Sequence, residues 1–278
     1  DMAGRYRAEV KTIEKPWGEW FSLDELEAAL IEHKPAILAM VHAETSTGVC
    51  QPMEGIGDLC RKHDCLLLLD TVTSLGGVPL YIDEWKVDLA YSCSQKGLSC
   101  PPGLGPFTMG PRAEAKMTAR QGKVPNWYLD VSLLNQYWGS DRVYHHTAPV
   151  NMNFGMREAL RLLAEEGLDQ AWARHRSNAE MLWNGLESLG LSMHVPAERR
   201  LPTLTTVRIP EGVDGKAFSQ HLLNNHCIEV GGGLGSLAGK IWRIGLMGYN
   251  STPENVNRLL NLFETELPRF SDSVAAAA

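Results

Sequence analysis

The sequence has no long hydrophobic run and no excess of basic residues. Its longest apolar runs, such as residues 36–41, and shorter ones such as Leu66–Leu69 fall far below the roughly 20 residues that a membrane-spanning helix requires. Its 33 acidic residues outnumber its 26 Lys and Arg residues, which gives a formal net charge of -7. Such a chain has no positive field that attracts phosphate backbones or an anionic bilayer. We therefore expect neither a membrane nor a nucleic acid as a partner.

Cysteine pairs with metal-site or disulfide spacing are also missing. None of the six cysteines forms a C-x-x-C motif, and several lie in apolar segments. This pattern favours reduced core residues in the cytoplasm over a disulfide framework or a zinc site. His145 and His146 are adjacent and so point in different directions, and no cysteine or carboxylate lies near them at metal-ligand spacing. We therefore expect no metal site.

Neither end of the sequence carries a targeting signal. The opening stretch, "DMAGRYRAEV", lacks an apolar signal core and an obvious start, so it is neither a secretory leader nor clearly a natural beginning. The tail "SDSVAAAA" has no Ser-Lys-Leu-type address. These observations predict a cytoplasmic protein rather than a peroxisomal one, and they are compatible with a fragment of a longer chain.

What the sequence does contain is an alternation of helix and strand signals over residues 22–110. Ser22 followed by Glu25 predicts the start of a capped helix. A second helix is expected over residues 53–63. Strands are expected at residues 36–42, 66–70, 87–94 and 105–110. This order is typical of a mostly parallel sheet that helices cover, and such sheets bind ligands beyond the carboxyl ends of their strands.

The second half of the sequence predicts a smaller domain. Residues 111–150 are rich in aromatic residues and look irregular, whereas residues 153–189 follow a helical pattern that breaks at Gly167. We therefore divide the chain into a large domain over residues 1–166 and a small α+β domain over residues 167–278. The small domain is expected to contain strands at 204–209, 228–232 and 240–246, a helix at 215–226, and a last helix capped by Ser251, Pro253 and Glu254.

Asp70 directly follows the buried run Leu66–Leu69, which is typical of a strand covered on both faces. An ionised carboxylate at the end of such a strand requires a partner. One interpretation is that Asp70 caps the next turn or accepts hydrogen bonds from backbone amides. The other is that a ligand supplies the partner.

Lys96 follows the next predicted strand, residues 87–94, and favours the second interpretation. Burial disfavours the charged form of a lysine, and a neutral amine is a nucleophile toward an aldehyde. Taken alone, Lys96 could equally be a surface residue in a turn. An aspartate and a lysine at the ends of two parallel strands are, however, what pyridoxal phosphate chemistry requires. The lysine binds the aldehyde carbon as a Schiff base, and the aspartate keeps the pyridine nitrogen protonated.

Arg243 lies at the centre of the apolar segment "KIWRIGL". An unpaired guanidinium there would be costly, so we expect it to meet a carboxylate. That carboxylate could belong to an internal Asp or Glu or to a substrate.

Five segments together resemble the class V aminotransferases, and specifically the alanine–glyoxylate (serine–glyoxylate) aminotransferase group. They are "VHAETSTGVCQP", "LLLLDTVTSLGGVPL", "DLAYSCSQKGLSCPPG", "YHHTAPV" and "KIWRIGLMGYN". The resemblance implies a fold-type I α/β enzyme that uses pyridoxal 5'-phosphate and forms a homodimer with shared active sites. It implies that Lys96 is the Schiff-base lysine and that Asp70 lies under the pyridine nitrogen.

The same resemblance assigns the other site residues. Val72 is expected to pack against the cofactor ring, Thr45 to form a hydrogen bond near it, and Gln95 to lie beside its phosphate. Tyr144 and Thr147 are expected to reach the phosphate of the neighbouring subunit's cofactor. Arg243 is expected to bind the α-carboxylate of the substrate, held by its planar fork.

The sequence departs from this family at its amino terminus. Members carry about 100 further residues before the equivalent of Asp1, including a Ser- and Gly-rich loop whose helix amino terminus binds the cofactor phosphate. An aromatic residue that stacks on the ring belongs to the same segment. We therefore expect residues 1–278 alone to bind the cofactor weakly and to expose apolar surface.

The function implied by the resemblance is a ping-pong transfer of an amino group from a small amino acid, alanine or serine, to glyoxylate. Other 2-oxo acid acceptors and a hydroxykynurenine donor remain open. A cysteine desulfurase-like enzyme is a second possibility, although Cys100 beside Pro101 and Pro102 is a poor candidate for its reactive cysteine. A third is a remnant of the fold that binds no cofactor.

Overall fold

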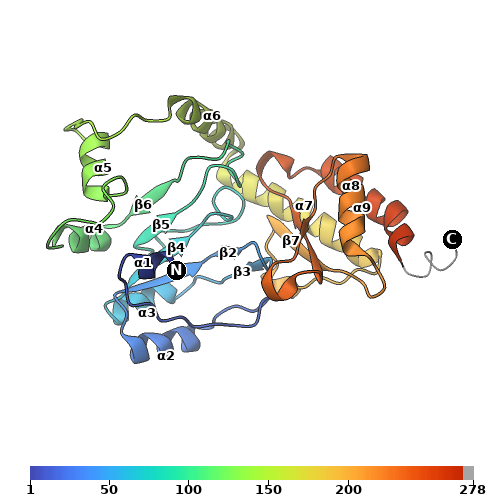
Figure 1. The fold of residues 1–278 in the computed structure, drawn as a ribbon, viewed down its shortest axis with the longest axis horizontal. Helices are drawn as coiled ribbons and strands as arrows, with labels where there is room; N and C mark the ends of the chain where they lie inside the picture. The colour runs from blue at the N-terminus through green and yellow to red at the C-terminus, as the bar shows by residue number, and fades with distance from the viewer. Residues whose placement is uncertain (272–278) are drawn as a thin grey trace.

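The computed structural model describes residues 1–271. Figure 1 shows two groups of elements, one built around the strands β1, β4, β5 and β6 and the other around β7, α7, α8 and α9. Every helix within the described residues is too short or too polar to cross a lipid bilayer. Most of the tail on which the localisation prediction rests, residues 272–278, lies outside the described part of the chain.

The first group contains a four-stranded sheet in the order β1-β4-β5-β6. β1 and β5 both run parallel to β4, whereas β6 runs antiparallel to β5. The mostly parallel sheet predicted from the alternation is therefore present. Its strands are β1 (Ile37–Val41), β4 (Leu66–Asp70), β5 (Leu89–Tyr91) and β6 (Phe107–Met109), and a separate hairpin is formed by β2 (Ala43–Glu44) and β3 (Val49–Cys50).

Two helices cover one face of this sheet. α2 (Leu23–His33) begins with the predicted capping box, in which the Ser22 hydroxyl accepts a hydrogen bond from the Glu25 amide. α3 (Ile56–Lys62) follows in the chain. Both helices pack on Leu67 and Leu69, whose side chains are fully buried. Apolar side chains on one stripe of each helix are thus removed from water against the sheet.

The other face of the sheet is largely open, although the run Leu66–Leu69 itself is buried or half-buried, as predicted. Val41 lies opposite Asp70, and Asp70 lies opposite Tyr91, so these side chains share one face. Ile37 and Phe107 on that face are 47% and 50% exposed. The exposed side chains of this face belong to the strands beside the apolar run, because burial depends on what packs above each strand.

Residues 111–150, expected to be irregular, contain two short helices. These are α4 (Pro111–Thr118) and α5 (Val131–Trp138). Pro111 occupies the first turn of α4, and the Asp130 carboxylate accepts a hydrogen bond from the Ser132 amide at the start of α5. Both are start signals that were available in the sequence. A short helix, α1 (Met2–Arg5), precedes all of these.

Two long helices follow and meet at Gly167, as the sequence predicted. α6 spans Val150–Glu166 and α7 spans Leu168–Ser188. Gly167 has φ +87°, a conformation that side-chain-bearing residues rarely adopt. The division into domains at residues 166 and 167 stays a prediction.

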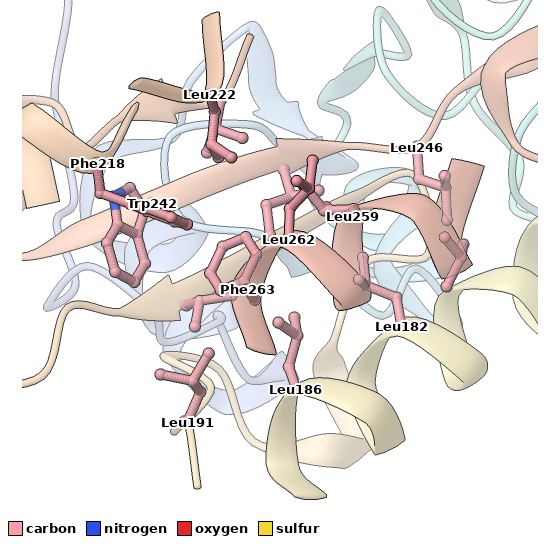
Figure 2. Packing of buried hydrophobic residues seen from close by; sticks show 14 residues of the cluster. Leu182, Leu186, Leu191, Phe218, Leu222, Trp242, Leu246, Leu259, Leu262 and Phe263 are labelled. Atoms are coloured by element: carbon pink, nitrogen blue, oxygen red, sulfur yellow. The ribbon is translucent and has the colours of Figure 1, made fainter. Parts of the chain in front are cut away.

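The second group packs three helices against a three-stranded antiparallel sheet in the order β7-β9-β8. Figure 2 shows its core, where Phe218, Trp242 and Phe263 pack edge to face with ring centroids 5.0 to 5.5 Å apart. Leu182 and Leu186 of α7 complete this core. The remaining elements are β7 (Leu204–Arg208), α8 (Gly215–His226), β8 (Gly231–Gly232), β9 (Ile241–Gly245) and α9 (Pro253–Glu266).

One detail of the last helix differs from the prediction. The side chain that caps α9 is Thr252, which accepts a hydrogen bond from the Asn255 amide, and not Ser251. Ser251 is fully buried and is used elsewhere, because its carbonyl and hydroxyl contact Asn178.

Candidate active site

Asp70 ends β4 on the open face of the sheet and has two hydrogen-bond donors. Its Oδ1 accepts a hydrogen bond from the Val72 amide at 2.8 Å. Its Oδ2 accepts one from the Tyr91 hydroxyl at 2.6 Å. The expected contact with backbone amides is therefore present. A carboxylate has about four lone-pair positions, so these two bonds leave room for a further donor.

Tyr91 is a site residue that the sequence reasoning missed. It ends β5 and lies directly opposite Asp70 in the parallel register. Burial, followed by the hydrogen bond to Asp70, raises the pKa of Tyr91 to about 12. The phenol therefore stays protonated at neutral pH and donates to the carboxylate. The sequence offered no signal for it, because the predicted strand 87–94 continues past Tyr91 and the register between the two strands is not readable from either one.

Lys96 lies half-buried in the bend that follows β5. No described side chain or carbonyl pairs with its ammonium group, so its Nζ is available. The bend is held tightly, because a Cβ on Gly97 would lie 2.4 Å from the Leu75 carbonyl oxygen. Thus the loop after β4 packs against the loop that carries Lys96. Gln95 is exposed.

Arg243 of β9 extends from the second group of elements toward the first. Its Nη1 donates to the Thr45 carbonyl at 3.3 Å, and its Nε donates to the Gly232 carbonyl at 2.7 Å. The structure thus brings Arg243 and Thr45 together. Its partners within residues 1–271 are carbonyl oxygens and not the internal carboxylate that the sequence left open. Its guanidinium keeps further N–H donors for an incoming anion.

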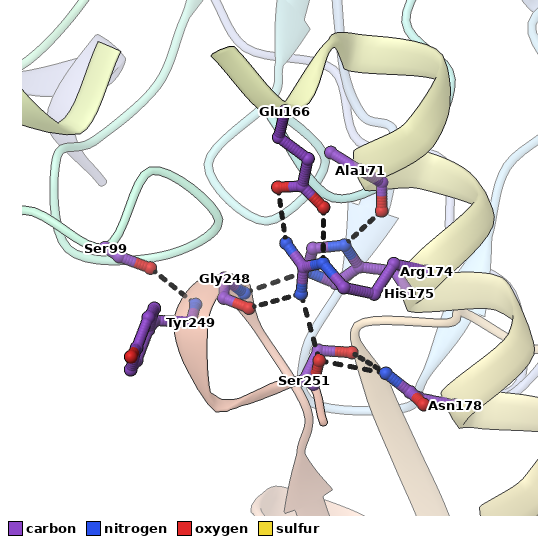
Figure 3. A network of polar contacts seen from close by, with 9 residues as sticks. All are labelled: Ser99, Glu166, Ala171, Arg174, His175, Asn178, Gly248, Tyr249 and Ser251. Atoms are coloured by element: carbon purple, nitrogen blue, oxygen red, sulfur yellow. Dashed lines mark hydrogen bonds and ion pairs between the residues drawn. The ribbon is translucent and has the colours of Figure 1, made fainter. Parts of the chain in front are cut away.

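A network of hydrogen bonds ties the Lys96 loop to the turn after β9 (Figure 3). The Ser99 hydroxyl accepts from the Tyr249 amide at 2.8 Å, and the His175 ring accepts from the Gly248 amide at the same distance. Arg174, paired with Glu166, donates to the Gly248 and Ser251 carbonyls. Burial lowers the pKa of His175, which keeps its accepting nitrogen unprotonated. The network therefore fixes the lysine loop relative to α7.

Tyr144 and Thr147 lie apart from these groups. Both are exposed, and their hydroxyl groups are 2.8 Å from each other. Within the described residues no hydrogen bond joins them to Asp70, Lys96 or Thr45. The intervening His145 stacks on Trp127, with ring centroids 4.0 Å apart.

A group that could ligate a metal lies elsewhere and was not anticipated. His221 in the middle of α8, His226 at its end and Glu266 at the end of α9 hold their ligand atoms within 4.8 Å of one another. His221 Nε2 is 3.0 Å from the Glu266 carboxylate, which also pairs with Arg269. The adjacent arginine cation opposes the binding of a metal ion to this carboxylate.

The residues at the strand ends fit pyridoxal phosphate in part. Asp70 is an oriented carboxylate with spare acceptor positions, and Lys96 is an available amine. Donors for the phosphate are not gathered around them, because Gln95 and Thr147 are both exposed. The described residues therefore suit the ring and the aldehyde of the cofactor but do not form a binding site for its phosphate.

Residues 1–259 match the family described as Aminotransferase class-V. An alanine–glyoxylate aminotransferase from Nostoc sp. is 63% identical, and its crystal structure superposes with a TM-score of 0.92 over 99% of this chain and 71% of that chain. The ureidoglycine–glyoxylate aminotransferase of Bacillus subtilis is 39% identical, with a TM-score of 0.94 over 99% of this chain and 73% of that chain. These likenesses confirm the predicted fold-type I class.

Among curated sequences, the alanine–glyoxylate aminotransferase of Mus musculus is 43% identical over 263 residues. The alignment covers 93% of this chain and 64% of the mouse protein. The chain thus spans slightly less than two thirds of the length of that relative.

Proposed function

Since this chain belongs to the class-V aminotransferase family, we propose that it holds pyridoxal phosphate and transfers the amino group of a small amino acid to a 2-oxo acid. The family uses this cofactor. The observation that carries the proposal is an oriented Asp70 carboxylate at the end of β4, together with an available Lys96 amine in the bend that follows the adjacent parallel strand β5.

Each proposed site residue has a separate task. When bound, pyridoxal phosphate supplies an aldehyde for amine exchange and a ring that accepts an electron pair. Lys96 would hold the cofactor through its aldehyde, would be released when the substrate's amine takes its place, and as the freed amine would move a proton at the substrate's α-carbon. Asp70 holds the positive charge on the ring nitrogen, and Tyr91 orients its carboxylate. Arg243 binds the substrate carboxylate with the N–H groups that its carbonyl partners leave unused.

Val72, Thr45 and Gln95 keep the roles that the family resemblance assigns. Val72 packs on the ring, Thr45 forms a hydrogen bond at its edge, and Gln95 lies beside the phosphate. The link from Arg243 to the Thr45 carbonyl supports a site to which both groups of elements contribute.

The amino acceptor is proposed to be glyoxylate and the donor alanine or serine. The support is that the similar proteins named above are alanine–glyoxylate and ureidoglycine–glyoxylate aminotransferases. A panel of donors and acceptors, with the 2-oxo acid product measured, decides between these substrates. Faster turnover with hydroxykynurenine than with alanine or serine would contradict the choice.

Reductive labelling tests the site itself. We expect borohydride treatment in the presence of pyridoxal phosphate to attach a pyridoxyl group to Lys96, located by peptide mapping. Lys96→Arg removes the label, whereas Lys123→Arg, a change at an exposed lysine outside the site, retains it. A label that maps to another lysine would contradict the assignment of Lys96. No label at all would favour the third possibility, a remnant of the fold that binds no cofactor.

A desulfurase-like function is the weaker alternative. That chemistry requires a cysteine that reaches the substrate from a mobile loop. Cys100 is only 5% exposed and lies in the tightly held segment that follows Lys96. Its amide donates to the Ser94 carbonyl at 3.0 Å, which holds this segment in place.

We further propose that two copies share their active sites. Tyr144 is 72% exposed, and Trp127, Trp138 and Phe154 nearby in the chain are also largely exposed. Aromatic residues exposed together are typical of a subunit interface. The size of the protein in solution, measured with and without Tyr144→Ala and Thr147→Ala, tests this, and a monomer with full activity would refute it.

The open face of the sheet supports a related proposal. The relatives are longer than the part that this chain matches, and Ile37, Val41 and Phe107 leave an apolar surface exposed beside Asp70. We propose that further chain covers this face and completes the phosphate site. Cofactor affinity should then be low for these 278 residues and rise when the additional segment of a relative is supplied. Tight binding by the 278 residues alone would refute this reading.

A cytoplasmic location remains part of the proposal. It is supported by the six cysteines, which are all unpaired within the described residues. Microscopy of a tagged copy tests it, and accumulation in peroxisomes would overturn it.

A further inference from the structure

Two histidines and a carboxylate converge in the second group of elements. His221 and His226 of α8 and Glu266 of α9 each place one ligand atom within 4.8 Å of the other two. All three side chains are half-buried, so the cluster is accessible from water yet partly shielded by the protein. None of the proposed active-site residues belongs to this cluster, so its chemistry is separate from that of Asp70 and Lys96.

Packing and hydrogen bonds fix the backbone positions that carry this cluster. The ring of Phe270 lies against those of His221 and Phe218, with centroids 5.2 and 5.5 Å apart. At the end of α8, the His226 carbonyl accepts a hydrogen bond from Arg258 of α9 at 2.6 Å. These contacts therefore bring the ligand side chains of the two helices together before any ion binds.

The Glu266 carboxylate keeps one oxygen for a further partner. His221 Nε2 lies 3.0 Å from Glu266 and Arg269 Nη1 lies 2.7 Å from it, and both contacts fall on the same oxygen, Oε2. Oε1 forms no hydrogen bond within residues 1–271, so it can bind an ion while Arg269 stays on Oε2. The Arg269 side chain is 64% exposed, and water therefore weakens its repulsion of a cation.

Both imidazole rings can present a nitrogen lone pair. His226 uses its backbone carbonyl for the bond with Arg258, and its ring nitrogens form no hydrogen bond within the described residues. His221 Nδ1 lies 2.9 Å from the side-chain amide of Asn225. After a half-turn of that amide, its oxygen accepts the Nδ1 proton and leaves a lone pair on Nε2, beside Glu266. Histidines that ligate a metal ion usually have such an acceptor on their second nitrogen, which orients the ring.

The ligand types of the cluster select zinc. Two imidazoles with one carboxylate suit a zinc ion, whereas calcium and magnesium prefer sites made of oxygen atoms alone. The ligand atoms of a tetrahedral zinc ion lie about 3.4 Å apart. Here His221 and Glu266 are 3.0 Å apart and the whole cluster lies within 4.8 Å, so a shift of about 1–2 Å in one side chain completes the set. The unpartnered ring of His226 can make this shift.

We propose that His221, His226 and Glu266 bind one zinc ion, with water in the remaining position. The ion joins α8 to the end of α9 and so stabilises the second group of elements against unfolding. Arg269 lowers the affinity without blocking the site, because it occupies only one oxygen of Glu266. The proposal does not rest on the proposed transaminase function, because no active-site residue takes part.

Calorimetric titration of the full chain with zinc chloride, after treatment with a chelator and without pyridoxal phosphate, tests the proposal. We expect one site with a dissociation constant between about 0.1 and 100 µM, weaker than that of structural sites with four protein ligands. The melting temperature should rise with zinc concentration, because the ion binds the folded chain. Magnesium chloride should bind at least about tenfold more weakly, since its ion prefers oxygen ligands.

Variants locate the ion. His226→Gln and Glu266→Gln should each weaken zinc binding at least about tenfold, because each removes a ligand. Arg269→Gln should strengthen it about two- to fivefold, because it removes the opposing cation. His33→Gln is the matched control: His33 lies 3.8 Å from the Glu32 carboxylate but belongs to no such cluster within the described residues. We expect that control to change the affinity less than about twofold.

The exposed thiol of Cys227, directly after His226, is the alternative ligand that the experiment must separate. Cys227→Ser should retain zinc binding, and in ¹⁵N-labelled protein two imidazole resonances, one missing from His226→Gln, should shift when zinc is added.

Several results would overturn the proposal. They are no saturation up to about 1 mM zinc, equal losses in His226→Gln and His33→Gln, or weaker binding in Arg269→Gln. Loss of binding in Cys227→Ser with retention in Glu266→Gln would place the ion on the thiol instead. Circular dichroism establishes that each variant is folded, and the imidazole resonances report the contact independently of the affinity.

Discussion

The two groups of elements bury their apolar surface in different ways. In the C-terminal group, the sheet β7-β9-β8 is packed against α7, α8 and α9, and Phe218, Trp242 and Phe263 are removed from water (Figure 2). In the N-terminal group, α2 and α3 cover one face of the sheet, while the face that carries Asp70 is open. A closed core supports stability, whereas an open face leaves side chains at the strand ends free to meet a ligand. The difference teaches that one half of this chain buries its apolar surface in a closed core, whereas the other half leaves side chains at its strand ends exposed.

The largest expected effect comes from truncating an aromatic ring in the closed core. Phe218→Ala should lower the free energy of unfolding by about 3–5 kcal/mol, because it leaves a cavity among three aromatic neighbours. Phe107→Ala on the open face is the matched control and should cost less than about 1 kcal/mol, since its ring is already half exposed. Urea unfolding measures both. Equal losses would show that the two faces are buried to the same degree in solution.

A pH effect of intermediate size is expected from His42, at the junction of the two groups. Burial lowers its pKa to about 4 in the folded protein, against about 6.5 in the unfolded chain. The unfolded chain therefore binds more protons between these values. The stability contribution is complete above about pH 6.5 and is lost as the pH falls toward 4, by about 2 kcal/mol at pH 5.

The variant His42→Phe keeps a ring against Trp85 but cannot titrate. Its free energy of unfolding, measured by urea at pH 7.5 and pH 5, should fall by about 2 kcal/mol less than that of the wild type. Identical pH dependence in the two proteins would mean that His42 is not buried in the neutral form. His175, also shifted downward by burial, remains in both proteins and serves as an internal reference.

An effect of similar size is expected at a buried ion pair of the N-terminal group. Asp88 is buried, accepts from the Leu67 amide at 2.9 Å and pairs with Arg112 at the same distance. Asp88→Asn keeps an acceptor for the amide but removes the charge, so it should cost about 2 kcal/mol. Glu158→Gln, which affects an exposed helical pair with Arg161, should cost less than about 0.5 kcal/mol. Thermal unfolding of both variants tests the contrast.

The smallest expected effect concerns the link between the two groups. Ser99→Ala removes the acceptor for the Tyr249 amide and should cost about 1 kcal/mol or less. The local consequence is larger than the global one: we expect faster hydrogen exchange at the Tyr249 amide, while the amides of β9 stay protected. Unchanged exchange at Tyr249 would show that the Lys96 loop is not held through this contact.

The candidate site was predictable to the extent that it depends on strand ends. Asp70 and Lys96 each follow an apolar run, and parallel strands present their carboxyl ends at one edge of a sheet. Tyr91 was missed because its partnership with Asp70 depends on the register of two strands, which neither strand reveals alone. The two carbonyl partners of Arg243 were missed for the same reason, since Thr45 lies far away in the chain.

The sequence by itself determined the local features of this protein. Capping residues set the starts of α2, α5 and α9, Pro111 set the start of α4, apolar runs set the strands, and Gly167 set the break between α6 and α7. These depend on hydrogen bonds and sterics among neighbouring residues, which are readable within a few positions. Only the tertiary structure decided which face of the sheet is open and what Asp70 and Arg243 contact. Those outcomes arise from contacts between segments far apart in the chain, whose distances no local pattern encodes.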